Sequence, residues 1–92
     1  MLELRITAKF KKDYRRIKRQ SKDLSKLEAI LEALMRGASL PDAMRDHSLG
    51  VTYRGHRECH IEPDWLLIYR IDEKGLVLVA TRTGSHSELL GL

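Results

Sequence analysis

Apolar and polar residues alternate at the start of the chain and then change to a helical spacing. Residues 2–7, LELRIT, alternate strictly, which is typical of a half-buried β-strand. Thr7 is a suitable N-cap for a helix that begins at Ala8. Apolar residues then recur at spacings of four and three, which predicts one apolar stripe on that helix. The stripe consists of Phe10, Tyr14 and Ile17.

A second helix is predicted from about residue 23 to residue 36. Its leucines recur every three or four positions and form one apolar face, with Ile30 beside them. Gly37 follows as a predicted C-cap, because glycine readily adopts left-handed backbone. The apolar face consists of Leu24, Leu27, Leu31 and Leu34. Each helix has one face to bury, so we expect an antiparallel helical hairpin that packs on a sheet.

The rest of the chain has the composition of β-strands. A loop at residues 38–50 includes a short helical turn at 41–44, and the sequence DEKG (72–75) marks a hairpin turn. The two strands that flank this turn are apolar on both faces, so we expect them in the middle of the sheet. The predicted strands are 51–55, 56–62, 65–72 and 76–82. The pattern predicts one α+β domain over residues 1–92, with both helices on one face of a twisted, mostly antiparallel sheet of four to five strands.

Charge is concentrated near the N-terminus. The net charge of the 92 residues is +4. Residues 1–26 hold ten Lys or Arg and three Asp or Glu, whereas residues 27–92 hold seven and ten. The basic block at residues 9–22 indicates a surface for nucleic acid or for an acidic partner. The alternative is a solvated helix face that serves solubility alone.

The single cysteine and the hydropathy suggest a compartment. Cys59 is the one cysteine, so no internal disulfide can form, and a reducing compartment is the simpler interpretation. We expect Cys59 to be a small core residue. The apolar runs are far shorter than the ~20 residues that a membrane-spanning helix needs, and residues 1–10 lack the apolar region of a signal peptide. We therefore expect a cytoplasmic protein.

Metal-dependent and serine-dependent chemistry are both weakly supported by the sequence. His56 and His60 are four residues apart on a predicted strand, which places them ~13 Å apart, too far to share one ion. No closely spaced Cys and His residues resemble a zinc site. Ser85 and Ser87 flank His86, but the G-x-S-x-G motif of serine hydrolases is absent. We therefore expect neither a metal nor a cofactor.

Acid–base chemistry on RNA fits the sequence better. His47, His60, Asp64 and His86 fall in predicted loops or at strand ends, where side chains can exchange protons near neutral pH. Arg82 adds a planar cation suited to phosphate. A base, an acid and a phosphate-binding cation are sufficient for cleavage by the ribose 2′-hydroxyl. Each residue also has a simpler explanation: a loop histidine can be solvated, Asp64 can be a turn residue, and Arg82 can form a surface ion pair.

Trp65 is open to two interpretations. Exposed bases of RNA often stack on aromatic rings, and Trp65 could supply such a surface. A tryptophan at the start of a strand is, however, more often a core residue.

Three stretches carry a resemblance to a known family. They are RDHSL (45–49), YRGHRECHIEPDWLLIYR (53–70) and RTGSHSELLG (82–91). In these motifs the chain resembles the YafQ-type toxins of the RelE/ParE superfamily, which belong to type II toxin–antitoxin systems. The resemblance implies a RelE-like fold and a small, metal-independent ribonuclease that cuts mRNA in the ribosomal A site and so inhibits translation.

The resemblance also implies roles for individual residues. It makes His86 the general acid and Arg82 the phosphate-binding residue, while Asp64, with His47 or His60, handles the 2′-hydroxyl proton. The implied catalytic set is His47, His60, Asp64, Arg82 and His86. The implied RNA-binding set is Trp65, Arg57, Lys11, Lys12, Arg15 and Arg16, with the basic helix against ribosomal RNA. Leu90 stands where the family has an aromatic residue, so substrate grip or codon preference can differ.

The same resemblance implies a partner. A cognate antitoxin, usually a small DNA-binding dimer, would hold the toxin inactive, cover the cleft or the basic helix, and contact operator DNA. The main alternative is a non-enzymatic toxin of the ParE kind that inhibits DNA gyrase by binding. A second alternative is a plain RNA-binding module. The three histidines and Asp64 together favour the nuclease.

Overall fold

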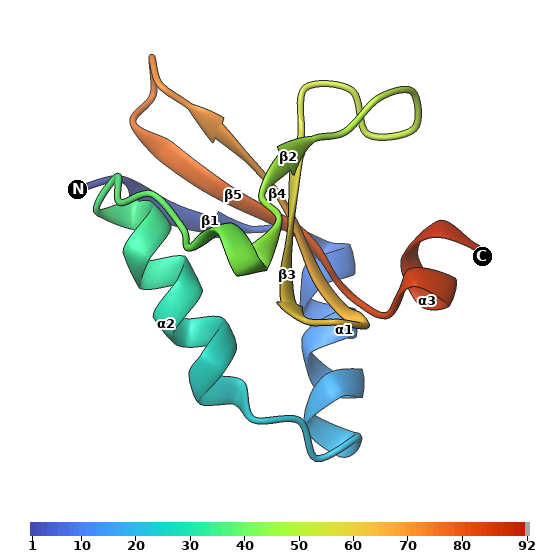
Figure 1. Ribbon diagram of the computed structural model, residues 1–92. Helices are drawn as coiled ribbons and strands as arrows, with labels where there is room; N and C mark the ends of the chain where they lie inside the picture. The colour runs from blue at the N-terminus through green and yellow to red at the C-terminus, as the bar shows by residue number, and fades with distance from the viewer. Residues whose placement is uncertain (92) are drawn as a thin grey trace.

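The sheet contains five strands, and the two strands that follow the N-terminal strand in the sheet come from the C-terminal part of the chain (Figure 1). A computed structural model describes residues 1–91. The order is β1-β5-β4-β3-β2, in which β1 is parallel to β5 and the other pairs are antiparallel. The strands are β1 (Glu3–Ile6), β2 (His47–Ser48), β3 (Arg57–Glu62), β4 (Trp65–Asp72) and β5 (Val77–Gly84). The predicted α+β class is confirmed, as are the inner positions of β4 and β5.

Two helices cover one face of this sheet and form its main core. Helix α1 (Ala8–Arg19) and helix α2 (Leu24–Met35) meet at a short connection and diverge from it, as Figure 1 shows. The Thr7 side chain accepts a hydrogen bond from the amide of Phe10, so the predicted N-cap of α1 is confirmed. The buried residues are Phe10, Ile17, Leu27, Ile30, Leu31, Leu34, Cys59, Trp65, Leu67, Tyr69, Leu78 and Ala80. The predicted apolar stripes therefore pack together on the sheet.

A smaller apolar cluster covers the opposite face. Leu66 and Ile68 of β4 point to this side and pack with Leu89 of a short helix, α3 (His86–Leu90). Because residues along a strand alternate between its faces, a strand with a core on each side must be apolar throughout. This second cluster explains why β4 has no polar alternation. Among the described residues, no helix is long and apolar enough to span a membrane.

The expected strand at residues 51–55 is wrong. Residues 49–56 form a turn, which is closed by hydrogen bonds from the Leu49 amide to the His56 carbonyl and from the His56 amide to the Tyr53 carbonyl. Gly55 adopts φ +82°, a left-handed conformation that interrupts an extended run. Tyr53 packs on the second cluster instead of pairing in the sheet. The two-residue strand β2 occupies the edge beside β3.

Two further details differ from the sequence-based expectations. Strand β1 is exposed rather than half-buried, with Leu4 36% and Ile6 41% accessible, because it is an edge strand that pairs only with β5. A 3-10 turn lies at Asp42–Met44, close to the short turn expected there. Helix α3 was not expected, because its five residues are too few for a helical period. The C-cap of α2 is Arg36 rather than the predicted Gly37, which follows it with φ +75°.

Replacing Glu88 with glutamine should destabilise the fold in a pH-dependent manner. The carboxylate of Glu88 accepts the Ser85 amide at 2.8 Å in a capping box and pairs with Arg16 at 3.0 Å. The Ser85 amide is the main cause that lowers the pKa of Glu88. A lowered folded-state pKa means that stability is present above the unfolded pKa, ~4.3, and is lost as pH falls through the folded value. We expect a loss of ~1 kcal/mol at neutral pH, which disappears in acid.

Urea unfolding of the wild-type protein and of Glu88→Gln, from neutral pH to below the unfolded pKa of ~4.3, measures the difference in stability. Glu28→Gln, at an exposed position of α2, is the matched control, and we expect it to be nearly neutral. A Glu88→Gln difference that persists unchanged at low pH would contradict the assignment to this carboxylate.

Candidate active site

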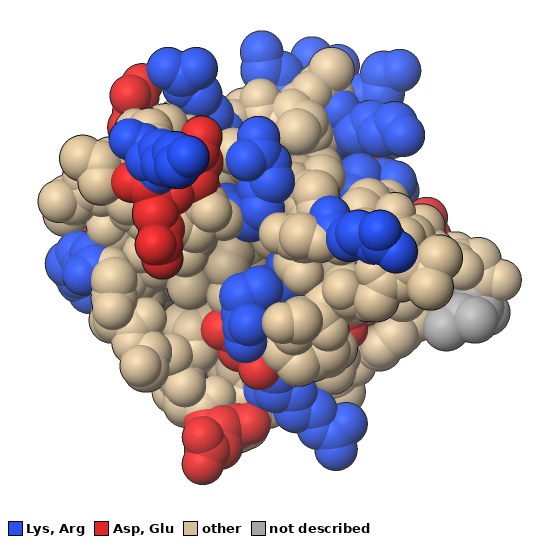
Figure 2. Space-filling view, turned by 90° about the horizontal axis from the view of Figure 1, so that it is seen from above, with Lys and Arg blue, Asp and Glu red and all other residues tan. Residues whose placement is uncertain are grey.

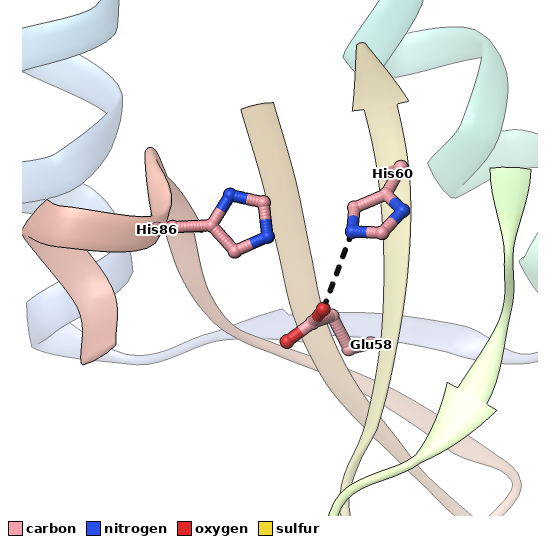
Figure 3. Close-up of side chains that lie close together, drawn as sticks. All are labelled: Glu58, His60 and His86. Carbon is pink, nitrogen blue, oxygen red and sulfur yellow. Dashed lines mark ion pairs between the residues drawn. The ribbon is translucent and has the colours of Figure 1, made fainter. Parts of the chain in front are cut away.

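Two residues of β3 begin the site, on the sheet face away from α1 and α2. Glu58 and His60 are two positions apart, so their side chains point to the same face, while Cys59 points into the helical core. Glu58 is buried, with 4% of its surface exposed. One carboxylate oxygen lies 3.5 Å from Nε2 of His60. Figure 3 marks this contact with a dashed line. The strand therefore presents an acid and an imidazole side by side.

His86 reaches the same place from the start of α3. Its ring Nδ1 lies 2.7 Å from Oδ1 of Asp64, and its backbone amide donates to the same oxygen at 2.9 Å. These two contacts orient the ring so that Nε2 faces His60 and Glu58 (Figure 3). Ligand atoms of Glu58, His60 and His86 all lie within 4.8 Å of one another. The backbone hydrogen bond from His86 is the main cause that lowers the pKa of Asp64.

His47 completes a group of three imidazoles. Strand β2 places it opposite Glu58, and its Nε2 lies 3.8 Å from the Glu58 carboxylate. Its Nδ1 lies 2.6 Å from the Arg45 carbonyl oxygen, which fixes Nδ1 as the protonated nitrogen in the neutral ring. The ring centroids of His47 and His60 are 6.3 Å apart, and those of His60 and His86 are 5.5 Å apart. The structure therefore brings the three predicted histidines together.

Burial gives His60 the character of a base. Its side chain is only 13% exposed, and desolvation is the main cause that lowers its pKa. A lowered pKa keeps the imidazole neutral near physiological pH, because burial penalises its charged form. Its Nε2 is buried and has no hydrogen-bond partner among the described residues. Such a nitrogen can accept a proton from a group that enters the site.

Arg82 lies in a different network from the imidazoles. Its Nε and Nη2 donate to the two carboxylate oxygens of Asp13 on α1, at 2.6 and 3.1 Å. Its Nη1 lies 3.4 Å from the Tyr53 hydroxyl. The Asp13 carboxylate is the main cause that raises the pKa of Arg82, so it remains charged. Asp64, directly before β4, bonds to His86 instead.

Trp65 is a core residue, and its interpretation as a stacking surface is wrong. Its ring is fully buried, and its Nε1 donates to the Thr83 hydroxyl at 2.9 Å. Lys22 lies over the ring, with its Nζ 5.6 Å from the centroid. A base cannot stack on a ring that has no accessible face. The large apolar ring packs better in the core than at the surface.

The predicted RNA-binding cations divide into exposed and internal ones. Lys11, Lys12 and Arg15 are exposed on α1. Arg16 instead pairs with Asp13 at 3.1 Å and with Glu88, and donates to the Thr83 carbonyl at 3.0 Å, so it joins α1 to the rest of the fold. Figure 2 shows lysine and arginine side chains crowded at the upper right of the view, with others scattered over the rest of this face.

Two other predicted contact residues have internal partners. Arg57 donates to Asp46 at 3.0 Å and to Ser48 at 3.1 Å, but its side chain remains 44% exposed. Leu90 is half-buried and packs on the second apolar cluster. Arg57 therefore still offers a charge to a ligand, while Leu90 is held mainly by the fold.

Sequence reasoning missed Glu58 and Asp13. Glu58 is two residues before His60, and the period of two along a strand places them on one face, so this signal was available. Asp13 is 2% exposed and lies within a strongly basic helix, where the pattern gave no sign of burial. Its partners, Arg82 and the Thr83 amide, are about 70 residues away in sequence. Long-range pairing of this kind leaves no local pattern.

Comparisons with known proteins identify close relatives over nearly the whole chain. Residues 2–91 match the family model for the bacterial toxin of type II toxin–antitoxin systems, YafQ. The mRNA interferase toxin YafQ of Escherichia coli K12 is 33% identical over 90 residues, which cover 97% of this chain and 96% of that protein.

Solved structures give the same result. The toxin from the E. coli DinJ–YafQ complex superposes with a TM-score of 0.89 and 34% identity, covering 99% of this chain and 100% of that one. A metal-bound toxin from Helicobacter pylori superposes with a TM-score of 0.92 and 36% identity, covering 98% and 100%.

Proposed function

The chain belongs to the YafQ family of toxins from type II toxin–antitoxin systems, and we propose that it is an mRNA interferase, a ribonuclease that stops translation by cutting mRNA. The observation that carries this proposal is the pairing of two unlike imidazoles, whose ring centroids are 5.5 Å apart. His60 is buried, with a free Nε2, and His86 is more exposed and held by Asp64. One imidazole suited to accept a proton and one suited to donate it are sufficient for RNA cleavage.

The proposed reaction uses the ribose 2′-hydroxyl as its nucleophile. His60 Nε2 takes the hydroxyl proton as the oxygen attacks the adjacent phosphorus. His86, in its protonated form, donates a proton from Nε2 to the 5′-oxygen as that bond to phosphorus breaks. The products are a 2′,3′-cyclic phosphate and a free 5′-hydroxyl, and both histidines have exchanged protonation states.

The neighbouring carboxylates act as positioning residues. The Asp64 carboxylate accepts from His86 Nδ1, which fixes the orientation of the ring. The pKa of Asp64 is itself lowered, mainly by the backbone hydrogen bond from His86, so this carboxylate is a poor base. Glu58 lies between His60 and His47 and limits their rotation. His47 supports this arrangement from β2. We thus assign the base to His60 rather than to Asp64.

Arg82 acts through the nitrogen that Asp13 leaves free. Its Nε and Nη2 are bound by Asp13, so Nη1, near the Tyr53 hydroxyl, is the atom available to a phosphate oxygen. A guanidinium fixed on two sides presents its positive charge without rearrangement. Arg82 would therefore contact the phosphate through one nitrogen and not as a bidentate guanidinium.

The exposed cations of α1 are the proposed contact with ribosomal RNA. Replacing Lys11, Lys12 and Arg15 with glutamine should weaken ribosome association and flatten its salt dependence. Each lost phosphate contact reduces the slope of log K against log salt by ~0.7–0.9, so we expect a change of about two. Co-sedimentation with ribosomes over a range of KCl concentrations measures this slope.

A matched triple variant at other exposed positions controls for net charge. Arg5, Arg70 and Lys74 lie on β1, at the end of β4 and in the following turn, and their replacement removes the same charge. Arg16 is left intact because its ion pairs belong to the fold. If the α1 variant keeps the wild-type slope, this helix does not contact RNA.

A cognate antitoxin is the proposed protein partner. The toxin of the E. coli DinJ–YafQ complex is solved with its antitoxin, and this chain matches it over its whole length. By analogy with such complexes, this chain would contact operator DNA only through the antitoxin. The proposed place of action is the cytoplasm, where mRNA is translated.

Cell-free translation of a defined mRNA tests the proposed function. New 5′ ends are mapped by primer extension with and without the protein, and with translation blocked before elongation. We expect in-frame cuts that depend on elongating ribosomes. Intact mRNA together with normal protein synthesis would overturn the proposal, and a gyrase supercoiling assay would then be the next experiment.

A further inference from the structure

A pocket lies beside His60, on the side where the chain enters β2. The 3-10 turn at Asp42–Met44 packs beside β3 (Figure 1), and between them lies a pocket of about 460 Å³. Its walls are residues 43–45 and residues 60–63. This volume is within the ~300–1,000 Å³ of pockets that hold small molecules. His60 therefore belongs both to the candidate active site and to this pocket.

The pocket has an excess of positive charge, because the one carboxylate in its wall is already paired. Oε2 of Glu62 bonds to Nζ of Lys26 at 2.9 Å. Arg45 is exposed, and its guanidinium forms no hydrogen bond or ion pair with residues 1–91. Burial is the main cause that lowers the pKa of His60, and the nearby Arg45 charge is a lesser one. An anion that enters beside His60 would therefore bind to Arg45.

The backbone of Arg45 is fixed by its neighbours. Its amide donates to the Asp42 carbonyl at 3.0 Å, and its carbonyl accepts from His47 Nδ1 at 2.6 Å. The next residue, Asp46, accepts from the Tyr69 hydroxyl at 2.7 Å and so ties this segment to the sheet. Arg45 has φ +50°, a left-handed conformation that is uncommon outside glycine and clusters at functional sites. A cation on a fixed backbone loses less freedom when it binds a ligand.

The rest of the pocket wall is suited to a base or a ribose. Met44 and Ile61 are partly buried and pack on the main core, and Pro63 is exposed beside them. Trp65 is fully buried, so a base beside His60 needs another apolar surface. A cation next to an apolar wall matches a nucleotide, which joins a charged phosphate to a flat ring.

We propose that this pocket binds the nucleotide next to the cleaved bond, with Arg45 on its phosphate and Met44 and Ile61 against its base. The RNA must pass His60 for its 2′-hydroxyl to give up a proton, which brings the adjoining nucleotide to the pocket. Arg82 offers only Nη1 to a phosphate, so Arg45 supplies a second cation. The part that this nucleotide plays in cleavage rests on the proposed function, whereas binding of a nucleotide in the pocket does not.

Titration of the free protein with a 2′-deoxy trinucleotide, followed by ¹⁵N NMR, tests the binding. This probe keeps the phosphates and bases but lacks the 2′-hydroxyl, so it cannot be cut. We expect amide shifts concentrated in residues 43–45 and 60–63. Arg45→Gln should weaken binding ~10–100-fold, as expected when a charged hydrogen bond is lost, and Arg45→Lys should weaken it less. Neither variant adds strain, because the replaced residue is not a glycine and its side chain forms no internal bond.

Arg5→Gln is the matched control, because Arg5 is an exposed arginine on β1, at the opposite edge of the sheet from β2. We expect it to bind the trinucleotide as the wild type does. Shifts confined to other residues, no shifts at millimolar trinucleotide, or equal affinity in the wild type and Arg45→Gln would overturn the site.

The translation assay tests the part that Arg45 plays in cleavage. Arg45→Gln should lower the cleavage rate ~10–100-fold at limiting toxin and less at saturating toxin, because the residue acts in binding. Arg45→Lys should recover most of this loss, and Arg5→Gln should cut as the wild type does. A normal rate in Arg45→Gln would overturn the contact with mRNA and leave the pocket to a protein ligand. If the wild type itself cuts nothing, the nuclease fails, and the trinucleotide titration still decides whether the pocket binds a nucleotide.

Discussion

Replacing His86 with glutamine is expected to lower the rate of mRNA cleavage by ~10²–10⁴-fold, the usual contribution of a general acid or base. Glutamine keeps a polar side chain that can bond to Asp64, but it cannot donate a proton to the departing 5′-oxygen. His86 is partly exposed at the start of α3, so its loss should cost little stability. The appearance of new mRNA 5′ ends over time, in cell-free translation with excess toxin, measures the rate.

The control for this change is His56→Gln, which alters a histidine outside the candidate site. We expect this control to cut at the wild-type rate. Asp64→Asn should fall between the two, because it keeps a hydrogen bond to His86 but loses the negative charge beside the His86 ring. Cleavage by His86→Gln within threefold of wild type would remove His86 from the chemistry.

Replacing Asp13 with alanine should cost ~3–5 kcal/mol of unfolding free energy, because one partner of a buried ion pair is removed. Asp13 accepts from Arg82, from Arg16 at 3.1 Å and from the Thr83 amide at 3.2 Å. The Arg82 side chain is only 17% exposed. Without the Asp13 carboxylate, its positive charge would therefore be largely buried and without an anionic partner. A domain of this size has only ~5–15 kcal/mol of stability, so a large share is lost.

Urea denaturation measures this loss, and a variant on the next helix is its control. Glu32 also pairs with an arginine, at 2.8 Å, but both side chains are more than half exposed. We expect Glu32→Ala to cost less than ~1 kcal/mol. Asp13→Asn should lie between the two, since one oxygen can still accept, and it serves if the alanine variant does not fold. Equal costs at Asp13 and Glu32 would show that burial of the Asp13 network contributes nothing.

The periodic elements could be predicted from the sequence, and the irregular ones could not. The helices α1 and α2 and the inner strands β4 and β5 were predicted because their apolar spacing is set by their own burial. Residues 51–55 have the composition of a strand, but tertiary packing of Tyr53 makes them a turn. The exposure of β1 depends on its place at the sheet edge, which local pattern does not record.

The candidate site, too, could be predicted from the sequence only in part. The motif residues His60, Asp64 and His86 were predicted, and the fold places them in contact. Their roles could not be apportioned from sequence, because a role depends on burial and hydrogen bonding. Burial lowers the pKa of His60 and so keeps its imidazole neutral and able to accept a proton, and the bond to His86 makes Asp64 a positioning residue. Trp65 was ambiguous because a motif can be shared for packing as well as for binding.

The position of Cys59 has a practical consequence for measuring how the molecule opens. Its side chain is fully buried in the helical core, and burial raises the pKa of its thiol to about 12. Alkylating reagents attack the thiolate, so the folded protein should be almost inert to them. As the chain has one cysteine, any label marks a single event, the separation of β3 from the helices. The labelling rate therefore reports core opening in dilute samples of the toxin.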